Sequence, residues 1–287
     1  MQKQAFRLPW LAQNDAFPPP HTAWGADSDA PGLLAAGGSL AVESLESAYS
    51  QGIFPWYSAG QPCLWWCPNP RMVLPVAQFK LHASLRKTIV RFSNTPGCEV
   101  RMDTAFAQVI QACAGRRVGR SKDASVQATG DFDADSDANS AADNPASAAL
   151  HTWIQPEMVT AYTALHQAGL AHSVETWVQG NLVGGLYLVN LGRMVFGESM
   201  FSRQTDASKI ALAALVAFCR SMGVPLIDCQ QNTSHLHSLG AHEVPRQDFL
   251  DHLSRHVHQG PPTWPAGRFD PIYWQKIVTP CPASVAP

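Results

Sequence analysis

Three closely spaced strands followed by a long apolar helix limit the fold of this 287-residue chain more than any other feature. Residues 171–202 predict the three strands, because turn sequences interrupt their apolar runs at 179–181 (QGN) and 190–192 (NLG). Residues 205–223 predict the helix, capped near Asp206 and closed by Gly223, and residues 225–230 predict a buried strand directly after it. This succession predicts a mixed α/β (α+β) fold with a central mixed sheet.

The chain divides into regions of different composition. Residues 1–73 are rich in Pro, Gly and Trp, which predicts a small, loop-rich N-terminal domain. Residues 74–262 are expected to form the larger, catalytic domain, and 263–287 a C-terminal tail. The apolar pattern also predicts strands at 72–76 and 100–103, and helices at 41–51, 80–92, 104–115 and 156–169.

The segment 116–150 lacks periodicity and is rich in Asp, Ser and Ala. It cannot bury enough apolar surface to order itself, so we expect a disordered insertion without a catalytic role. Its six Asp residues also hide a basic excess, since without them the 22 acidic residues fall to 16 against 20 Lys and Arg. Residues 80–122 alone hold nine basic and two acidic residues. Such a stretch suits a phosphate-bearing partner or an ordinary solvated surface, and charge alone does not decide between them.

The sequence argues against several classes of protein. No apolar run approaches the roughly 20 residues of a membrane span, and the first residues lack the apolar core of a signal peptide, so we expect a cytoplasmic protein. The seven cysteines are scattered, which is typical of free thiols. Cys63 and Cys67 could supply half of a zinc site, but no second pair or nearby His completes it. We therefore expect no metal and no cofactor.

The predicted order of helix, three-strand meander, helix and strand is similar to that of GNAT-like acyltransferases. Acetyl-CoA-dependent members of that fold hold the pyrophosphate with a glycine-containing turn after the central strand. Residues 202–209 stand at this position and read SRQTDASK, without a glycine. The sequence therefore indicates an acyl donor other than coenzyme A. The first alternative to this interpretation is an acetyl-CoA-dependent N-acetyltransferase, and the missing glycine argues against it.

Ten short motifs, in one order along the chain, carry a more specific resemblance. They are GLLAAGGSL (32–40), AYSQGIFPWY (48–57), LWWCPNPRMVL (64–74), TWI (152–154), AHSVETW (171–177), LVGGLY (182–187), FGESMFSR (196–203), ASKIAL (207–212), LIDCQ (226–230) and SLGA (238–241). Together they resemble the leucyl/phenylalanyl-tRNA–protein transferases over most of the chain, interrupted only by the acidic segment. The resemblance implies transfer of Leu or Phe from Leu-tRNA or Phe-tRNA to the α-amino group of proteins that begin with Arg or Lys. The new N-terminus marks those proteins for degradation.

The resemblance also implies which residues carry the chemistry. An aminoacyl ester is already activated, so the reaction needs positioning, help with one proton and stabilisation of an oxyanion. Asp228 and Gln230 alternate along one predicted strand and so point to one face, and the resemblance implies that they assist the attacking amine. Glu198 would hold the α-amino group of the transferred residue. The alternatives are a structural Asp228 at a strand end, and an ion pair of Glu198 with Arg203 or Lys209.

Binding sites for the transferred side chain and the tRNA follow from the same resemblance. The side chain would enter an apolar pocket lined by Leu186, Val195, Met200, Leu215, Cys219 and Ile227, residues that plain core packing would also explain. The aromatic residues that match the 3′ adenosine site are Trp56, Trp153 and Tyr162, with Tyr49 in support. The tRNA acceptor stem would lie on a basic helix that carries Lys80, Arg86, Lys87 and Arg91.

Two further alternatives concern function. A non-catalytic tRNA-binding module would have no need of the Asp228 and Gln230 pair beside an apolar pocket. A transferase of altered scope, such as one that adds Leu to acidic N-termini, is compatible with the same motifs, and the preference among Leu, Phe and Met stays open. The chain is expected to act as a monomer.

Overall fold

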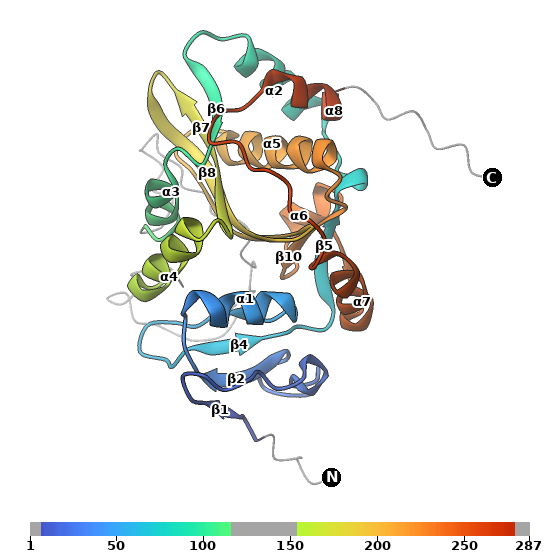
Figure 1. The fold of residues 1–287 in the computed structure, drawn as a ribbon. Coiled ribbons are helices and arrows are strands. Elements are labelled where there is room, and N and C mark those ends of the chain that lie inside the picture. Colours follow the sequence, from blue (N-terminus) through green and yellow to red (C-terminus); the bar gives the residue numbers. More distant parts are fainter. Residues whose placement is uncertain (1–6, 116–153, 279–287) are drawn as a thin grey trace, which may run out of the picture.

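The computed structural model describes residues 7–115 and 154–278, which form two β-sheets with helices packed around the larger one (Figure 1). The mixed α/β class predicted from the sequence is confirmed. The acidic segment at 116–150 and Trp153 lie outside the described residues, as does the end of the chain after 278.

The smaller sheet belongs to the loop-rich N-terminal region. Its four strands lie in the order β1-β2-β4-β3, and their bounds are β1 Trp10–Leu11, β2 Leu33–Gly37, β3 Phe54–Pro55 and β4 Leu64–Trp66. Tryptophan explains how such short strands hold together: the fully buried Trp65 donates from Nε1 to the Gly37 carbonyl (2.8 Å) and packs edge-on against Phe17. The helix α1 (Val42–Ser50) lies between this sheet and the larger one (Figure 1).

The larger sheet has eight strands among the described residues, in the order β11-β5-β10-β9-β8-β7-β6-β12. Their bounds are β5 Arg71–Pro75, β6 Cys98–Met102, β7 Ala171–Val178, β8 Asn181–Leu191, β9 Met194–Ser202, β10 Leu226–Gln230, β11 His242–Val244 and β12 Gly267–Arg268. The predicted meander is confirmed as β7, β8 and β9. The strands β9 and β10 are parallel and the other described neighbours antiparallel, so the sheet is mixed.

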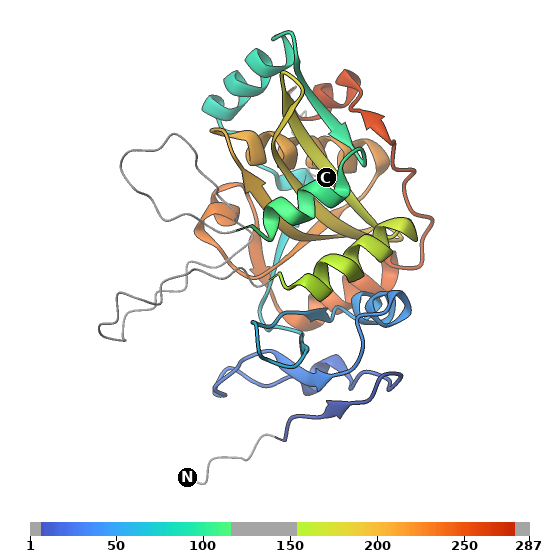
Figure 2. The same cartoon turned by 90° about the vertical axis from the view of Figure 1, so that its left-hand side faces the viewer.

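Helices cover both faces of this sheet. The helices α3 (Phe106–Cys113) and α4 (Pro156–Gln167) pack with α1 and α7 (Arg246–His256) on one face, which we call the α4 face. On the other, the α5 face, lie α2 (Ala83–Ser93) and α5 (Ala207–Met222). Figure 2 shows α3 and α4 in front of the sheet and α5 behind it. The remaining short helices are η1 Pro20–Thr22, η2 Val76–Gln78, α6 Ser234–Ser238, η3 Pro271–Trp274 and α8 Gln275–Val278.

The long apolar helix lies very close to the sheet. A Cβ on Gly184 of β8 would approach the Cβ of Ala207 to 2.5 Å, so the first turn of α5 fits only against a glycine. The helix ends where the sequence predicts, at Gly223, whose φ is 69°. Asp206 stands at the N-cap position, as predicted, but its φ is 63° and its side chain accepts from Lys209 instead of capping a backbone N–H.

The described residues after 263, which were expected to form a tail, pack on the larger domain. β12 pairs with β6, and Phe269 and Ile277 are buried among the residues of the α5 face. Trp264 stacks on His172 with ring centroids 4.3 Å apart. These apolar contacts account for the ordered packing.

Within the described residues, no helix is both long enough and apolar enough to cross a membrane.

Candidate functional site

A buried carboxylate lies where α1, α4, β9 and β10 meet. Glu198 of β9 is 2% exposed and accepts hydrogen bonds from the Tyr49 hydroxyl (2.7 Å), the Tyr162 hydroxyl (3.2 Å) and Nε2 of Gln230 (2.9 Å). The two hydroxyl oxygens are 2.5 Å apart, so three contacts share two hydroxyl hydrogens. A proton on Glu198 would supply the third hydrogen. Four residues distant in the sequence thus form one polar network on the α4 face.

Burial sets the ionisation of this carboxylate. Desolvation is the largest influence on Glu198 and raises its pKa from 4.5 to about 7, against the lowering effect of the hydrogen bonds from Tyr49 and Tyr162. The charge of the nearby Asp228 raises the pKa further, and the bond from Gln230 lowers it. Glu198 therefore changes its charge near neutral pH, which is the range in which a carboxylate can bind or release an ammonium group reversibly.

Removing the Tyr49 hydroxyl should weaken the ionised state of Glu198. We expect Tyr49→Phe to lower the free energy of unfolding by about 1–3 kcal/mol at pH 8, because a buried carboxylate loses a donor. The loss should be smaller at pH 5, where the protonated Glu198 needs that donor less. Chemical denaturation at both pH values measures the difference. Tyr57→Phe, which removes a longer bond to Glu157 (3.2 Å), is the matched control and should cost less at both; equal losses would contradict the assignment.

A second buried pair lies beside this network. Arg71, the first residue of β5, donates from Nε and Nη2 to the two carboxylate oxygens of Asp228 in β10, at 2.8 and 2.6 Å. Both side chains are at most 1% exposed. The guanidinium carbon of Arg71 also lies over the rings of Phe54 and Phe249, 4.8 and 4.6 Å from their centroids. Asp228 is thus a fully paired charge and does not face solvent.

The alternation predicted for Asp228 and Gln230 along one strand is interrupted in the structure. The pairing of β10 with β5 shifts register between these two residues, and Gln230 has a φ of 63°, in the left-handed region. Its backbone N–H donates to Oδ1 of Asp228 (2.9 Å) while its side chain turns to Glu198. The alternative ion pair of Glu198 with Arg203 or Lys209 is wrong, since neither cation contacts it in the described residues.

The six predicted pocket residues lie together on the α5 face. Leu186, Val195, Met200, Leu215, Cys219 and Ile227 belong to one apolar cluster, and each is at most 1% exposed. Tyr49 and Tyr162 belong to the cluster on the opposite face. The structure brings the six together as closed core, so a side chain could enter only if α5 and the sheet moved apart. Their role in binding an amino acid stays a prediction.

The aromatic residues predicted for the adenosine site are only partly brought together. Tyr49 and Tyr162 are fully buried and bind Glu198, as described above. Trp56 is partly exposed directly after β3 and packs edge-on against Trp66, with centroids 5.4 Å apart. Of the predicted set, Trp56 therefore offers an accessible ring, whereas the two tyrosines offer hydroxyl groups within the network.

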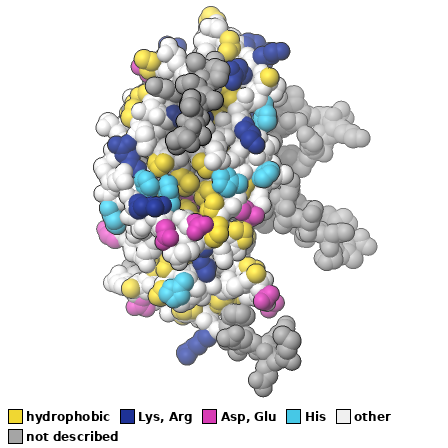
Figure 3. Space-filling model, turned by 90° about the vertical axis from the view of Figure 1, so that its right-hand side faces the viewer, with side chains coloured by type: hydrophobic (Ala, Val, Ile, Leu, Met, Phe, Trp, Pro, Cys, Tyr) yellow, Lys and Arg dark blue, Asp and Glu magenta, His cyan; other side chains and the backbone are white. Residues whose placement is uncertain are grey.

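The predicted basic helix is amphipathic. Leu85 and Ile89 are buried on the α5 face, while Lys87 and Arg91 are exposed. The helix begins at Ala83, so Lys80 precedes it instead of lying on it; its backbone N–H bonds the Leu239 carbonyl. Figure 3 shows Lys and Arg side chains more often over the upper part of the face it draws, toward the end of the molecule where Figure 1 has α2.

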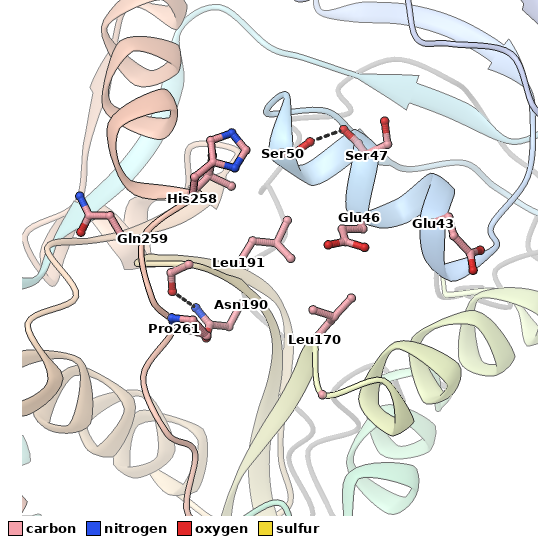
Figure 4. Close-up of a pocket in the computed structure, with 13 residues that line it drawn as sticks. Glu43, Glu46, Ser47, Ser50, Leu170, Asn190, Leu191, His258, Gln259 and Pro261 are labelled. Carbon is pink, nitrogen blue, oxygen red and sulfur yellow. Dashed lines mark hydrogen bonds between the residues drawn. The ribbon is translucent and has the colours of Figure 1, made fainter.

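A separate cavity of about 590 Å³ lies between α1, the β8–β9 turn and the chain after α7 (Figure 4). Its lining is mixed, with Glu43 and Glu46 of α1 opposite Leu191 and His258. None of the residues that line it belongs to the predicted site. Nor is any group of three or more His, Cys, Asp or Glu side chains within residues 7–115 and 154–278 arranged to hold a metal ion.

Sequence reasoning missed Arg71. It stands in the motif LWWCPNPRMVL, directly before the strand predicted at 72–76, and the motif alone gives it no role. The available signal was chemical: a carboxylate on a buried strand requires a cation or several donors.

Comparison with known proteins agrees with the motifs. Residues 116–254 match the family model for leucyl/phenylalanyl-tRNA protein transferase, and 38–69 the model for the N-terminal domain of the same proteins. The chain is 54% identical over 272 residues to the leucyl/phenylalanyl-tRNA–protein transferase of Polaromonas sp., covering 95% of this chain and 94% of that one. It is 55% identical over 281 residues to that of Albidiferax ferrireducens, covering 98% of each chain. The chain therefore belongs to the leucyl/phenylalanyl-tRNA–protein transferase family, a family of aminoacyltransferases.

Proposed function

We propose that this protein transfers Leu or Phe from aminoacyl-tRNA to the α-amino group of proteins that begin with Arg or Lys. Membership of the family supports the aminoacyl transfer. Acceptor proteins modified in this way would be marked for degradation in the cytoplasm. The protein would act as a monomer and without a cofactor, because an aminoacyl ester already carries the energy of the new amide bond.

The observation that carries the proposal is the buried carboxylate of Glu198 with its three donors. Such a site binds an ammonium group well, since the incoming positive charge removes the cost of an ionised, desolvated carboxylate. The α-ammonium group of the esterified amino acid is a ligand of this kind. Because the pKa of Glu198 is raised to about 7, the carboxylate is largely ionised above that pH and available for the contact.

The transfer itself would follow from this arrangement. The acceptor amine attacks the ester carbonyl, the new C–N bond forms, and the bond from the carbonyl carbon to the 3′ oxygen of the tRNA breaks. The amine gives up one proton and the 3′ oxygen takes one. Gln230 donates from Nε2 to Glu198, so its carbonyl oxygen is the end of the amide that can accept an N–H from the attacking amine. Positioning of the amine next to the ester would account for most of the acceleration.

In vitro transfer tests the proposal. Purified protein is incubated with radiolabelled Leu-tRNA, Phe-tRNA or Met-tRNA and peptides that begin with Arg, Lys, Asp or Glu, with radiolabelled acetyl-CoA in a parallel reaction. We expect label from Leu-tRNA and Phe-tRNA on the peptides that begin with Arg and Lys. Label on acidic N-termini alone would replace the proposed acceptor, and label from acetyl-CoA would replace the donor.

The exposed cations near α2 should contribute to tRNA affinity. We expect the triple variant Lys80→Glu, Lys87→Glu and Arg91→Glu to weaken binding and to flatten its salt dependence, by roughly 0.7–0.9 in the log–log slope for each phosphate that the variant no longer neutralises. Filter binding over a range of salt concentrations measures both. Arg255→Glu, an exposed cation of α7, is the control and should leave the slope unchanged. The same slope in the triple variant would remove this region from the tRNA site.

A further inference from the structure

We infer that the buried Arg71–Asp228 ion pair is a positioning device that holds Gln230 against Glu198, and that Asp228 does not itself touch the attacking amine. The inference rests on the proposed function, because it concerns the geometry of the transfer site. It adds Arg71, a residue of the neighbouring strand, to the groups on which the reaction depends.

A cationic partner separates Asp228 from the reacting atoms, whereas the donors around Glu198 are neutral. The side chain of Asp228 is 0% exposed, and three donors already occupy its oxygens, namely Nε and Nη2 of Arg71 and the backbone N–H of Gln230. An arginine that donates two parallel hydrogen bonds to a carboxylate occupies the positions at which the N–H groups of an amine would bind. An amine that bound this carboxylate would have to displace Arg71, which also contacts two aromatic rings.

Gln230, by contrast, needs support to keep its conformation. A residue other than glycine in the left-handed region costs roughly 1–2 kcal/mol, and Gln230 adopts it at a register shift in β10. Its backbone N–H would point elsewhere in a regular strand, whereas here it donates to Oδ1 of Asp228 at 2.9 Å. That bond stabilises the turn of the backbone which brings Nε2 within 2.9 Å of Glu198.

Arg71 completes the device because it fixes Asp228. Two parallel hydrogen bonds fix both the position and the plane of a carboxylate, which a single ammonium group cannot do. The guanidinium also contacts the rings of Phe54 and Phe249, which restrict its movement. Contacts therefore run without interruption from Arg71 through Asp228 and Gln230 to Glu198.

The first test is Arg71→Lys, which keeps the charge but removes the bidentate geometry. We expect kcat for transfer from Leu-tRNA to fall by about 10–100-fold with KM unchanged, since misplacement by about 1 Å can cost 100-fold. In a Gln230→Ala background the same substitution should cause no further fall, because it acts through Gln230. If Arg71→Lys lowered kcat by the same factor in the wild type and in Gln230→Ala, the inference would be overturned and Arg71 would be a purely structural residue. A wild-type kcat in Arg71→Lys would overturn the inference as well.

The pair variant Arg71→Met/Asp228→Leu separates positioning from folding. Replacement of a buried ion pair by apolar residues of similar volume is often neutral or stabilising, so the variant should unfold at a temperature close to that of the wild type. We expect its kcat to fall at least as far as that of Arg71→Lys. Wild-type kcat in the pair variant would overturn the inference. So would transfer by the triple variant that is slower than transfer by Gln230→Ala alone, because Asp228 would then act on the amine directly.

A measurement without substrate distinguishes failure of this inference from failure of the proposed function. The side-chain amide signal of Gln230 can be assigned in ¹H–¹⁵N spectra by its absence in Gln230→Ala. We expect this amide to be protected from hydrogen exchange in the wild type and to lose protection at least tenfold in Arg71→Lys. Unchanged protection would overturn the positioning role even if the protein transferred no amino acid, whereas absence of transfer by the wild type would overturn only the proposed function.

Discussion

Asp228→Asn is expected to lower both the stability and the transfer rate. The substitution keeps the shape of the side chain and removes its charge, so Arg71 stays buried without a counter-ion. Breaking a buried ion pair on one side typically costs about 3–5 kcal/mol. The transfer rate should fall about 100-fold because Gln230 loses its support. Chemical denaturation and single-turnover transfer measure the two effects.

The control for this variant is Asp251→Asn on α7, whose exposed carboxylate accepts a hydrogen bond from the neighbouring Gln247. An exposed contact of this kind contributes less than about 1 kcal/mol, and the rate should not change. Transfer by Asp228→Asn at the wild-type rate would remove Asp228 from the site altogether. Loss of stability without loss of rate would leave it a structural residue of β10.

Glu198→Gln is expected to raise stability at pH 8 while it abolishes most transfer. The ordinary pKa of the glutamate is 4.5, and burial raises it to about 7 in the folded protein. The folded state therefore binds the proton more tightly than the unfolded state does. Ionised Glu198 costs stability above pH 7, and this cost disappears as the pH falls from 7 towards 4.5. The amount is on the order of 3 kcal/mol, since one pKa unit corresponds to about 1.4 kcal/mol.

The variant should lack this dependence on pH, because glutamine carries no charge at any pH in the range. Its free energy of unfolding should exceed that of the wild type at pH 8 and approach it near pH 5. Transfer should fall about 100-fold or more, since a neutral amide holds an α-ammonium group poorly. Urea denaturation at several pH values measures the stability.

The matched control is Glu175→Gln, another fully buried glutamate. Glu175 accepts from the backbone N–H of Thr104 and of Ala105 at the start of α3, and from Nε1 of Trp177. Loss of these charge-assisted bonds should destabilise the protein, the opposite sign to Glu198→Gln. A destabilised Glu198→Gln at pH 8 would show that the donors around Glu198 outweigh its burial.

Local patterns in the sequence determined most of the secondary structure. The meander of β7, β8 and β9 was predicted from its turns at 179–181 and 190–192, and the end of α5 from Gly223. Such signals depend on residues close together in the chain, which is why they can be found without the fold. The start of α5 was predicted less well: Asp206 resembles a cap by residue type, but its backbone is left-handed and its side chain turns to Lys209.

The sequence and its resemblance to a family also supplied Glu198, Asp228, Gln230, Tyr49 and Tyr162 as candidates. Only the tertiary structure showed that Glu198 and Asp228 have different surroundings. Glu198 lies among neutral donors and its pKa rises, whereas Asp228 is paired with a cation. Desolvation and charge depend on everything packed around a group, and those neighbours come from distant parts of the chain.

The pairing of Arg71 with Asp228 is the feature that the sequence was least able to predict. Arg71 stands 157 positions before Asp228, and only the antiparallel pairing of β5 with β10 brings the two within 2.8 Å. The left-handed backbone of Gln230 also depends on the tertiary structure, because the hydrogen bond from its N–H to Asp228 offsets its strain. The sequence by itself determined the order of elements, the family and most of the candidate residues. The partners and the ionisation of those residues were decided by tertiary packing, since a buried charge is stable only beside the groups that the fold brings to it.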